Sequence, residues 1–239
     1  MSGARLALYW APELDDPLHR LGSAWLGRDA GTGAPLPQPP LPTGLDIAEI
    51  TAAPRLYGLH ATLKPPFRLA RPFPGAVAAA EALAARTAPF DLPPLAVREL
   101  RGFLALRETR PCPALHALAD ACVAALDPCR APPTEAELAR HRAAGLNPAQ
   151  EGLLARWGYP YVLGEWRFHV TLTRRLTAAE RAVVLPAARA HLGEAAARPR
   201  RVGSLCLFTQ AGPGAPFLVA QRLALRGAER GGAPFPAPD

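Results

Sequence analysis

The chain has 239 residues, with 27 Lys and Arg against 20 Asp and Glu, and its formal net charge is +7. Hydrophobic residues make up 49% of it, which excludes a wholly disordered protein, and the length fits one large domain or two small lobes. Lys64 is the only lysine, and the arginines are scattered rather than bunched, so the charge alone is weak support for a nucleic-acid-binding surface.

The sequence indicates no metal centre, disulfide framework or membrane segment. Cys112, Cys122, Cys129 and Cys206 lack the close pairs of a zinc site, and a domain of this size needs no disulfides, so we expect reduced, mostly buried thiols. The first apolar run is followed at once by acidic residues and is too short for a signal peptide or a membrane span. We therefore expect a cytoplasmic protein without membrane contact.

The first half of the chain is predicted to alternate between strands and helices. Aliphatic and aromatic residues predict a strand over 5–11, and Asp16 and Pro17 are suited to begin a helix over 16–26. The Gly- and Pro-rich segment 27–43 predicts a surface loop, either a lid or disordered. The other elements expected in this half are a strand at 58–64 stopped by Pro65 and Pro66, an Ala-rich helix at 75–87, and two short strands within 95–107 bent near Gly102.

The second half is predicted to begin with helices and to end with strands. Thr134 with Glu137, and Thr177 with Glu180, have the spacing of capping boxes, in which each side chain bonds the other residue's backbone amide. The elements expected here are helices at 113–126, 134–144 and 148–157, a strand at 165–173, a helix at 177–192, and a strand pair at 202–209 and 217–225 before a frayed tail.

A short motif occurs twice. His60-Ala61-Thr62-Leu63 and His169-Val170-Thr171-Leu172 each precede a predicted helix and two predicted strands. Fewer than one His-x-Thr triplet is expected by chance in this composition, so the pair indicates an internal duplication. We expect a single bilobal domain over 1–239, with lobe one at about 1–110, a helical middle at about 111–160, lobe two at about 161–226 and the tail at 227–239. In it the two histidine strands face one another across a central groove.

This arrangement suits a phosphodiester. Because side chains alternate along a strand, each histidine shares a face with the threonine two residues on. Hydroxyls and cations can bind phosphate oxygens, and imidazoles titrate near neutral pH, where they can take up or release a proton. The residues expected on the two groove faces are His60, Thr62 and Lys64 on one strand, and Arg167, His169, Thr171 and Thr173 on the other.

The two motifs and their flanks resemble the 2H phosphoesterase superfamily, which includes RNA ligase-like proteins and 2′,3′-cyclic nucleotide phosphodiesterases. The flanks YGLHATLKPPF at 57–67, FHVTLT at 168–173 and PGAPF at 213–217 are most similar to the 2H subfamily encoded beside phosphonate-degradation genes. The similarity runs from LYWAP at 8–12 to about Arg222, with Leu59 where that subfamily is expected to have an aromatic residue.

The resemblance implies an α+β, bilobal fold of duplicated β-α-β units with mostly antiparallel sheets around a central groove. It also implies metal-independent phosphodiester hydrolysis without a cofactor, with His60 and His169 as the catalytic pair and Thr62 and Thr171 binding the phosphate. The expected substrate is a 2′,3′-cyclic nucleotide or a ribose cyclic phosphate, in phosphonate metabolism. The expected partner is accordingly a small cyclic phosphate or an RNA 3′ end, and a monomer is favoured.

Other residues and functions stay open. Lys64 is expected to bind phosphate, Tyr9 either to reach the groove or to pack in the core, and Arg167 and Thr173 either to bind substrate or to lie at the rim. The histidines predicted on helices, expected to be surface or capping residues, are His19, His116, His141 and His191. The alternatives to an enzyme are a non-catalytic protein that binds RNA or nucleotide ends and a pathway partner with a vestigial site.

Overall fold

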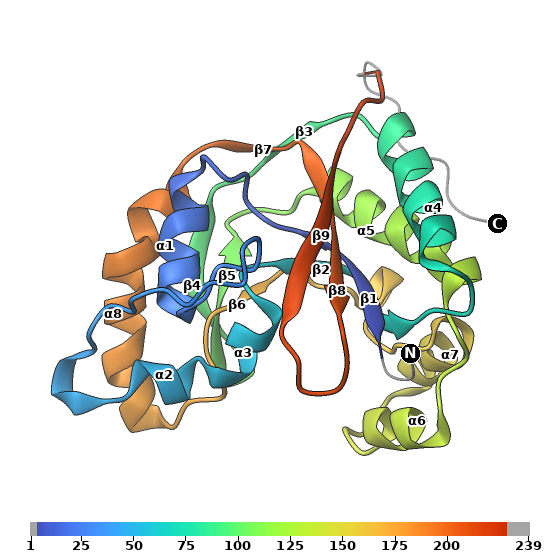
Figure 1. Cartoon of the computed structure of the whole chain (residues 1–239). Coiled ribbons are helices and arrows are strands. Elements are labelled where there is room, and N and C mark those ends of the chain that lie inside the picture. The colour runs from blue at the N-terminus through green and yellow to red at the C-terminus, as the bar shows by residue number, and fades with distance from the viewer. Residues whose placement is uncertain (1–3, 229–239) are drawn as a thin grey trace.

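The computed structural model describes residues 4–228, which form an α+β fold around one large sheet (Figure 1). Every strand pair among these residues is antiparallel. The large sheet has the spatial order β4 (Leu95–Leu100), β5 (Phe103–Glu108), β6 (Val170–Thr171), β2 (Ala61–Arg68), β1 (Arg5–Trp10), β8 (Ser204–Gln210) and β9 (Phe217–Ala224). A separate pair consists of β3 (Phe90–Leu92) and β7 (Arg200–Val202).

Helices cover the sheet from two sides of Figure 1, with α1 and α8 on the left and α4 and α5 on the right. The α-helices are α1 (Pro17–Leu26), α2 (Ile47–Ile50), α3 (Ala52–Tyr57), α4 (Phe73–Arg86), α5 (Pro113–Leu126), α6 (Glu135–Arg142), α7 (Pro148–Trp157) and α8 (Ala178–Ala197). Single 3-10 turns lie at η1 (Pro42–Gly44), η2 (Asp127–Cys129) and η3 (Leu163–Glu165).

The two halves of the chain exchange their strand pairs. After β2 and α4, the chain forms β4 and β5, and β5 lies beside the second histidine strand, β6. After β6 and α8, it forms β8 and β9, and β8 lies beside β1, the neighbour of β2. Consistent with this exchange, α8 packs on β4 and α4 packs on β8 and β9. The lobe boundaries expected near 1–110 and 161–226 therefore do not coincide with groups of neighbouring strands.

The helix starts predicted at Asp16, Thr134 and Thr177 are confirmed by their capping contacts. The Asp16 carboxylate accepts a hydrogen bond from the Leu18 amide at 2.8 Å, and Thr134 and Thr177 each begin a helix with a complete capping box. The predicted β4–β5 hairpin turns through Arg101 and Gly102, both with positive φ, as the tight turns that match strand twist require.

Three predicted boundaries are wrong. The strand at 58–64 does not stop at Pro65 and Pro66 but runs to Arg68, because shifts in the β1–β2 register accommodate residues that lack an amide hydrogen. The strand at 165–173 is reduced to Val170–Thr171, since its first residue belongs to η3. Helix α8 continues past the predicted end to Ala197, and α2, α3, β3 and β7 were not predicted.

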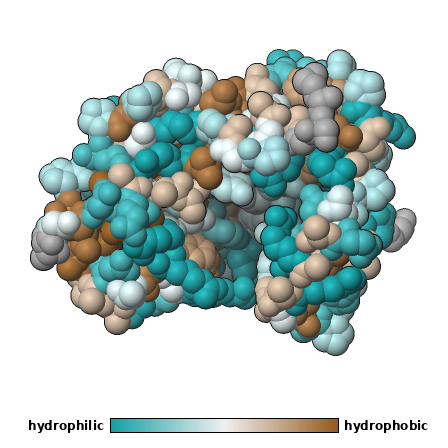
Figure 2. Space-filling model, turned by 60° about the horizontal axis from the view of Figure 1, so that its bottom comes forward, coloured by the Kyte–Doolittle hydropathy of each residue, from teal (hydrophilic) through white to brown (hydrophobic). Residues whose placement is uncertain are grey.

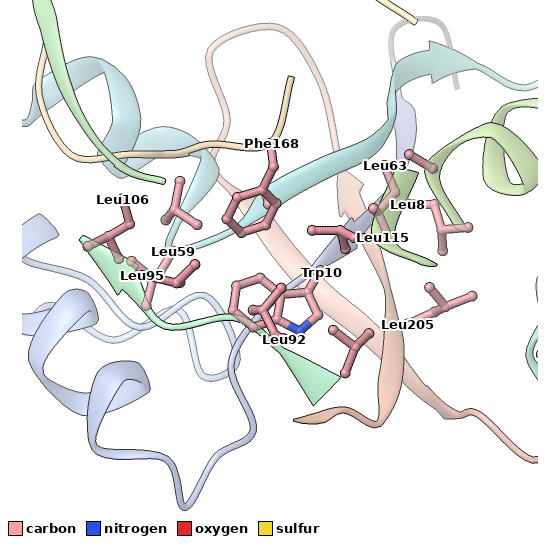
Figure 3. Close-up of a cluster of buried hydrophobic side chains, with 14 of the residues drawn as sticks. Leu8, Trp10, Leu59, Leu63, Leu92, Leu95, Leu106, Leu115, Phe168 and Leu205 are labelled. Carbon is pink, nitrogen blue, oxygen red and sulfur yellow. The ribbon is translucent and has the colours of Figure 1, made fainter. Parts of the chain in front are cut away.

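One face of the sheet carries most of the hydrophobic core. Figure 3 shows Trp10 of β1 close to Phe168, and their ring centroids are 5.8 Å apart. As predicted, Ala61 and Leu63 in the first motif, and Val170 in the second, are buried there. Each large apolar side chain buried in this way contributes roughly 1.5–3 kcal/mol, so the motif strands are anchored through their core faces. The opposite faces are left for polar residues.

The loop over 27–43 packs against the protein, and its Ala30 lies in one cluster with Phe208 and Phe217 of the sheet and accepts the Val219 amide at 2.9 Å. The Gln38 amide donates hydrogen bonds to the Trp25 carbonyl and the Thr51 hydroxyl, and Arg28 and Pro35 form an isolated bridge. The four cysteines are buried and unpaired, as predicted. Within residues 4–228, no helix combines the length and apolarity that crossing a bilayer requires. Most of the tail expected to fray, 229–239, lies outside the described residues.

Candidate active site

The two histidine motifs lie on adjacent strands of the sheet. Ala61 of β2 pairs with Val170 of β6, so in antiparallel register His60 lies beside Thr171 and Thr62 lies beside His169. His60 and His169 are therefore diagonal neighbours on the two strands. Such residues are roughly 7–8 Å apart, which brings the two imidazoles to one site. The expectation that the two strands face one another across a groove is wrong, because strand exchange makes them direct neighbours.

Backbone carbonyls orient both imidazoles in the same way. The Nδ1 atom of His60 donates to the Gly58 carbonyl at 2.9 Å, and Nδ1 of His169 donates to the Arg167 carbonyl at 2.8 Å. A carbonyl can only accept, so in each neutral ring the proton is on Nδ1 and the lone pair is on Nε2. The Nε2 atom of His60 lies 3.3 Å from the Thr62 hydroxyl.

His60 lies in an aromatic setting. Its ring stacks on Tyr9, with centroids 3.9 Å apart, and faces Tyr57 at 5.9 Å. Burial lowers the pKa of His60 to about 4, the hydrogen bond to the Gly58 carbonyl offsets part of this effect, and His169 lowers the pKa further. The imidazole of His60 is therefore neutral near pH 7 and able to accept a proton.

His169 lies among charged residues of β5. Ala105 pairs with Thr171, so Arg107 lies beside His169 in the same register. Burial lowers the pKa of His169, the Arg167 carbonyl opposes this, Arg107 lowers the pKa and Glu108 raises it. The Nε atom of Arg107 is buried without a hydrogen-bond partner among the described residues. No sequence motif marks Arg107, and only strand pairing brings it to the site.

A cavity of about 430 Å³ opens beside His60. Its walls come from β1 and β2, from α3 on one side and from α6 and the end of α7 on the other. Figure 2, turned so that the bottom of Figure 1 comes forward, shows a deep hollow with hydrophilic residues along much of its rim. The predicted site residues in its wall are Tyr9, His60, Thr62, Lys64, Thr171 and Thr173.

Lys64 does not share a face with His60 and Thr62 as predicted. Thr62 pairs with Tyr9, but Lys64 pairs with Leu8, whose side chain belongs to the core face, because β2 holds an extra residue between these pairs. The buried ammonium donates to the Val123 carbonyl at 3.0 Å and lies 3.4 Å from an Asp127 carboxylate oxygen. Burial lowers the pKa of Lys64 to about 8, and Asp127 opposes that effect.

The other predicted residues divide into two groups. Tyr9 reaches the cavity, where its buried hydroxyl has no hydrogen-bond partner among the described residues. The Thr173 hydroxyl accepts the Leu104 amide at 2.9 Å, so it also fastens β5 to the second motif. Arg167 is exposed, does not line the cavity, and donates to the Gly164 and Trp166 carbonyls.

Several cavity residues could not be recognised in the sequence. His141, expected to be a surface or capping residue, lines the cavity and contacts Tyr159 edge to face, with ring centroids 5.1 Å apart. The other unpredicted wall residues with polar or charged groups include Arg5, Tyr57, Arg68, Arg130, Glu137 and Arg140. Helix α6 has no buried residue, so no hydrophobic period indicated which of its faces meets the cavity.

The two His-x-Thr motifs thus lie side by side in one α+β fold. The chain belongs to the family described as "Protein of unknown function (DUF1045)", which matches residues 62–218. The match includes His169 and begins two positions after His60. Among residues 4–228, no group of three or more His, Cys, Asp or Glu side chains is arranged to hold a metal ion.

Relatives and solved structures resemble the chain over most of its length. It is 42% identical over 235 residues to a protein named ribose 1,5-bisphosphate phosphokinase PhnN from Janthinobacterium sp. (strain Marseille). That alignment covers 95% of this chain but 52% of the relative, so the chain spans about half the relative's length. LigT of E. coli, solved with NADP+, aligns over 94% of this chain and 99% of its own, with 14% identity and a TM-score of 0.47. TT0787 of Thermus thermophilus aligns over 93% and 98%, with 19% identity and a TM-score of 0.47.

Proposed function

We propose that this protein is a metal-independent phosphodiesterase that hydrolyses a small cyclic phosphate by acid–base catalysis with His60 and His169. The observation that carries the proposal is the β2–β6 pairing, which sets each histidine beside the threonine of the other motif. Two imidazoles whose Nε2 atoms carry a lone pair when the rings are neutral, together with two hydroxyls, can serve one phosphate at the same time. Thr62 and Thr171 would bind its non-bridging oxygens.

The reaction needs one proton acceptor and one proton donor. In the proposed mechanism, neutral His60 takes a proton from a water molecule as the water oxygen bonds to phosphorus. The bond from phosphorus to one ester oxygen of the ring breaks, and protonated His169 gives its proton to that oxygen. The product is a phosphomonoester with a free hydroxyl. Burial lowers the pKa of both imidazoles, and the large shift of His60, to about 4, supports the assignment of the neutral base to His60 rather than to His169.

The name of the Janthinobacterium relative, about half of whose length this chain matches, favours a sugar substrate. That relative is named for a ribose bisphosphate, and ring opening of a ribose cyclic phosphate leaves a ribose phosphate. A kinase of the P-loop type needs a lysine followed by Ser or Thr, whereas the only lysine here, Lys64, is followed by Pro65. We therefore assign a kinase activity of that type to the part of the relative outside the match.

The test is hydrolysis of ribose 1,2-cyclic phosphate and adenosine 2′,3′-cyclic phosphate, followed by ³¹P NMR with and without EDTA. We expect a phosphomonoester product, activity that survives the chelator, and loss of activity in His60→Ala and His169→Ala. His19→Ala is the matched control, because His19 lies on α1, outside the cavity wall, near Asp29. Activity that disappears with EDTA, or that survives both substitutions, would contradict the proposal. Tight, salt-dependent binding of RNA ends without turnover would favour the non-catalytic binder instead.

A further inference from the structure

We propose that the end of the cavity away from His60 binds a second phosphate group of the same substrate, so that the substrate is the cyclic phosphate of a phosphorylated sugar. This inference rests on the proposed function and adds the substrate class. Three features of the cavity carry it: two arginines in register, a buried hydroxyl without a partner, and an excess of positive charge.

The first feature is a pair of arginines on neighbouring strands. Arg5 of β1 pairs directly with Arg68 of β2, and both line the cavity. Like charges directly opposite each other in an antiparallel sheet repel, so this pair favours an anion bound beside it. Arg5 lies four residues from Tyr9 along β1, or roughly 13 Å, and Tyr9 stacks on His60. The arginines and the histidine thus mark two ends of one cavity.

The second feature is the Tyr9 hydroxyl. It is fully buried and has no hydrogen-bond partner among the described residues, although buried polar groups are nearly always paired. Burial raises the pKa of Tyr9 well above its ordinary value, the hydroxyls of Tyr57 and Tyr159 raise it further, and Arg5 lowers it. The hydroxyl is therefore a protonated donor whose titration Arg5 influences, and a phosphate oxygen would complete its bonding.

The third feature is the balance of charge. The cavity wall holds five Lys and Arg residues and one carboxylate, that of Glu137. Lys64 and Arg130 are both paired with Asp127, and Arg68 is 3.4 Å from Glu137. Within residues 4–228, Arg5 and Arg140 have no carboxylate partner, and Arg5 donates through Nε to the neutral Gln210 at 2.7 Å. A phosphomonoester dianion suits several guanidinium donors better than a neutral sugar does.

The experiment compares substrates that differ by one phosphate. Steady-state kinetics are measured for ribose 1,2-cyclic phosphate with and without a 5-phosphate, and for adenosine 2′,3′-cyclic phosphate with and without a 5′-phosphate. We expect the 5-phosphate to raise kcat/KM of the ribose substrate at least about tenfold, the effect of one charge-assisted contact. Equal kcat/KM for the two ribose substrates would overturn this inference and leave the proposed function standing.

Three variants locate the effect. Arg5→Gln and Arg68→Gln should each remove most of the 5-phosphate advantage, because they lower kcat/KM for the doubly phosphorylated substrate much more than for the singly phosphorylated one. Tyr9→Phe keeps the ring on His60, and it should reduce the advantage while raising the melting temperature, because it deletes an unpaired buried hydroxyl. Arg110→Gln, at an exposed arginine outside the cavity wall, is the control. An advantage that persists in both arginine variants would contradict the assignment.

Two measurements separate the remaining outcomes. If no cyclic phosphate is hydrolysed, the proposed function fails, and calorimetry with ribose 5-phosphate against ribose still tests the anion site. There we expect binding of ribose 5-phosphate that Arg68→Gln weakens at least about tenfold, and no binding to wild type would overturn the inference. The last comparison uses a short RNA that ends in a 2′,3′-cyclic phosphate. If Arg5→Gln and Arg68→Gln lower kcat/KM for this RNA more than kcat/KM for the ribose substrate, the site binds an RNA backbone phosphate. That result would also overturn the inference.

Discussion

The two copies of the histidine motif share a backbone arrangement but not an environment. His60 precedes an eight-residue strand and stacks on Tyr9, whereas His169 precedes a two-residue strand and lies beside Arg107. In both copies Nδ1 is bonded to the carbonyl two residues earlier. The comparison teaches that a duplicated motif supplies two equally oriented imidazoles, and that their neighbours then give them different proton affinities.

The residue that directly follows the four-residue motif, here called its fifth position, differs between the copies as well. Four residues after each histidine stand Lys64 and Thr173, and both are buried. Lys64 joins β2 to Val123 of α5, and Thr173 joins the second motif to Leu104 of β5. Each copy thus uses its fifth residue to fasten the motif to a neighbouring element.

The largest expected effect comes from removing either imidazole. His60→Ala and His169→Ala should each lower kcat/KM by about 10²–10⁴-fold, the usual contribution of positioned proton transfer. The double variant should lose little more than either single variant, because acid and base act in the same step. Rates with the preferred cyclic phosphate, together with circular dichroism to verify folding, check this. A much larger loss in one copy than in the other would show that the two imidazoles do not share the reaction.

The next effect concerns stability at the fifth position. Asp127→Asn leaves the buried Lys64 ammonium without a carboxylate and should lower the free energy of unfolding by about 3 kcal/mol. Lys64→Met should cost less, because Asp127 keeps Arg130 at 2.9 Å, and Thr173→Val should cost about 1–2 kcal/mol. Urea denaturation measures all three. A loss of kcat/KM in Lys64→Met without loss of stability would instead support a role for Lys64 on the substrate.

The third effect is a dependence of stability on pH that belongs mainly to the first copy. His60 has a folded pKa of about 4 and an ordinary value of 6.5, so between these values the unfolded chain binds a proton that the folded protein does not. Stability should therefore be complete above about pH 6.5 and fall by roughly 3 kcal/mol as the pH is lowered to about 4. His60→Gln should remove most of this slope, and His169→Gln should remove less. If the free energy of unfolding changes with pH equally in the two variants, the two histidines contribute equally, which would contradict this prediction.

The smallest effect concerns the two threonines. Thr62→Val and Thr171→Val should each lower kcat/KM about tenfold to a hundredfold, because each removes one hydrogen bond to a charged phosphate. Thr62 also lies 3.3 Å from Nε2 of His60, so its variant should shift the pH–rate profile while that of Thr171 does not. Thr87→Val is a matched control, since the hydroxyl of this buried threonine donates to the Leu83 carbonyl of the preceding helix and the residue is outside the cavity wall. Identical profiles for the two site variants would contradict the assignment.

Local chemistry was predictable and strand pairing was not. Alternation predicted that Ala61 and Val170 face the core, and capping spacing predicted the starts of α6 and α8, because these features depend on neighbours in sequence. The β2–β6 contact joins strands from opposite halves of the chain, and no local pattern specifies it. Lys64 was assigned to the wrong face because the extra residue in β2 reverses the alternation.

The exchange of strand pairs has a consequence for how the polypeptide acquires its structure. β1 and β2 form near the start of synthesis, but β8, which covers the open side of β1, is translated about two hundred positions later. Until then a hydrophobic strand edge stays exposed, a common origin of aggregation. A ribosome-bound or truncated product lacking the last hairpin should therefore depend on chaperones.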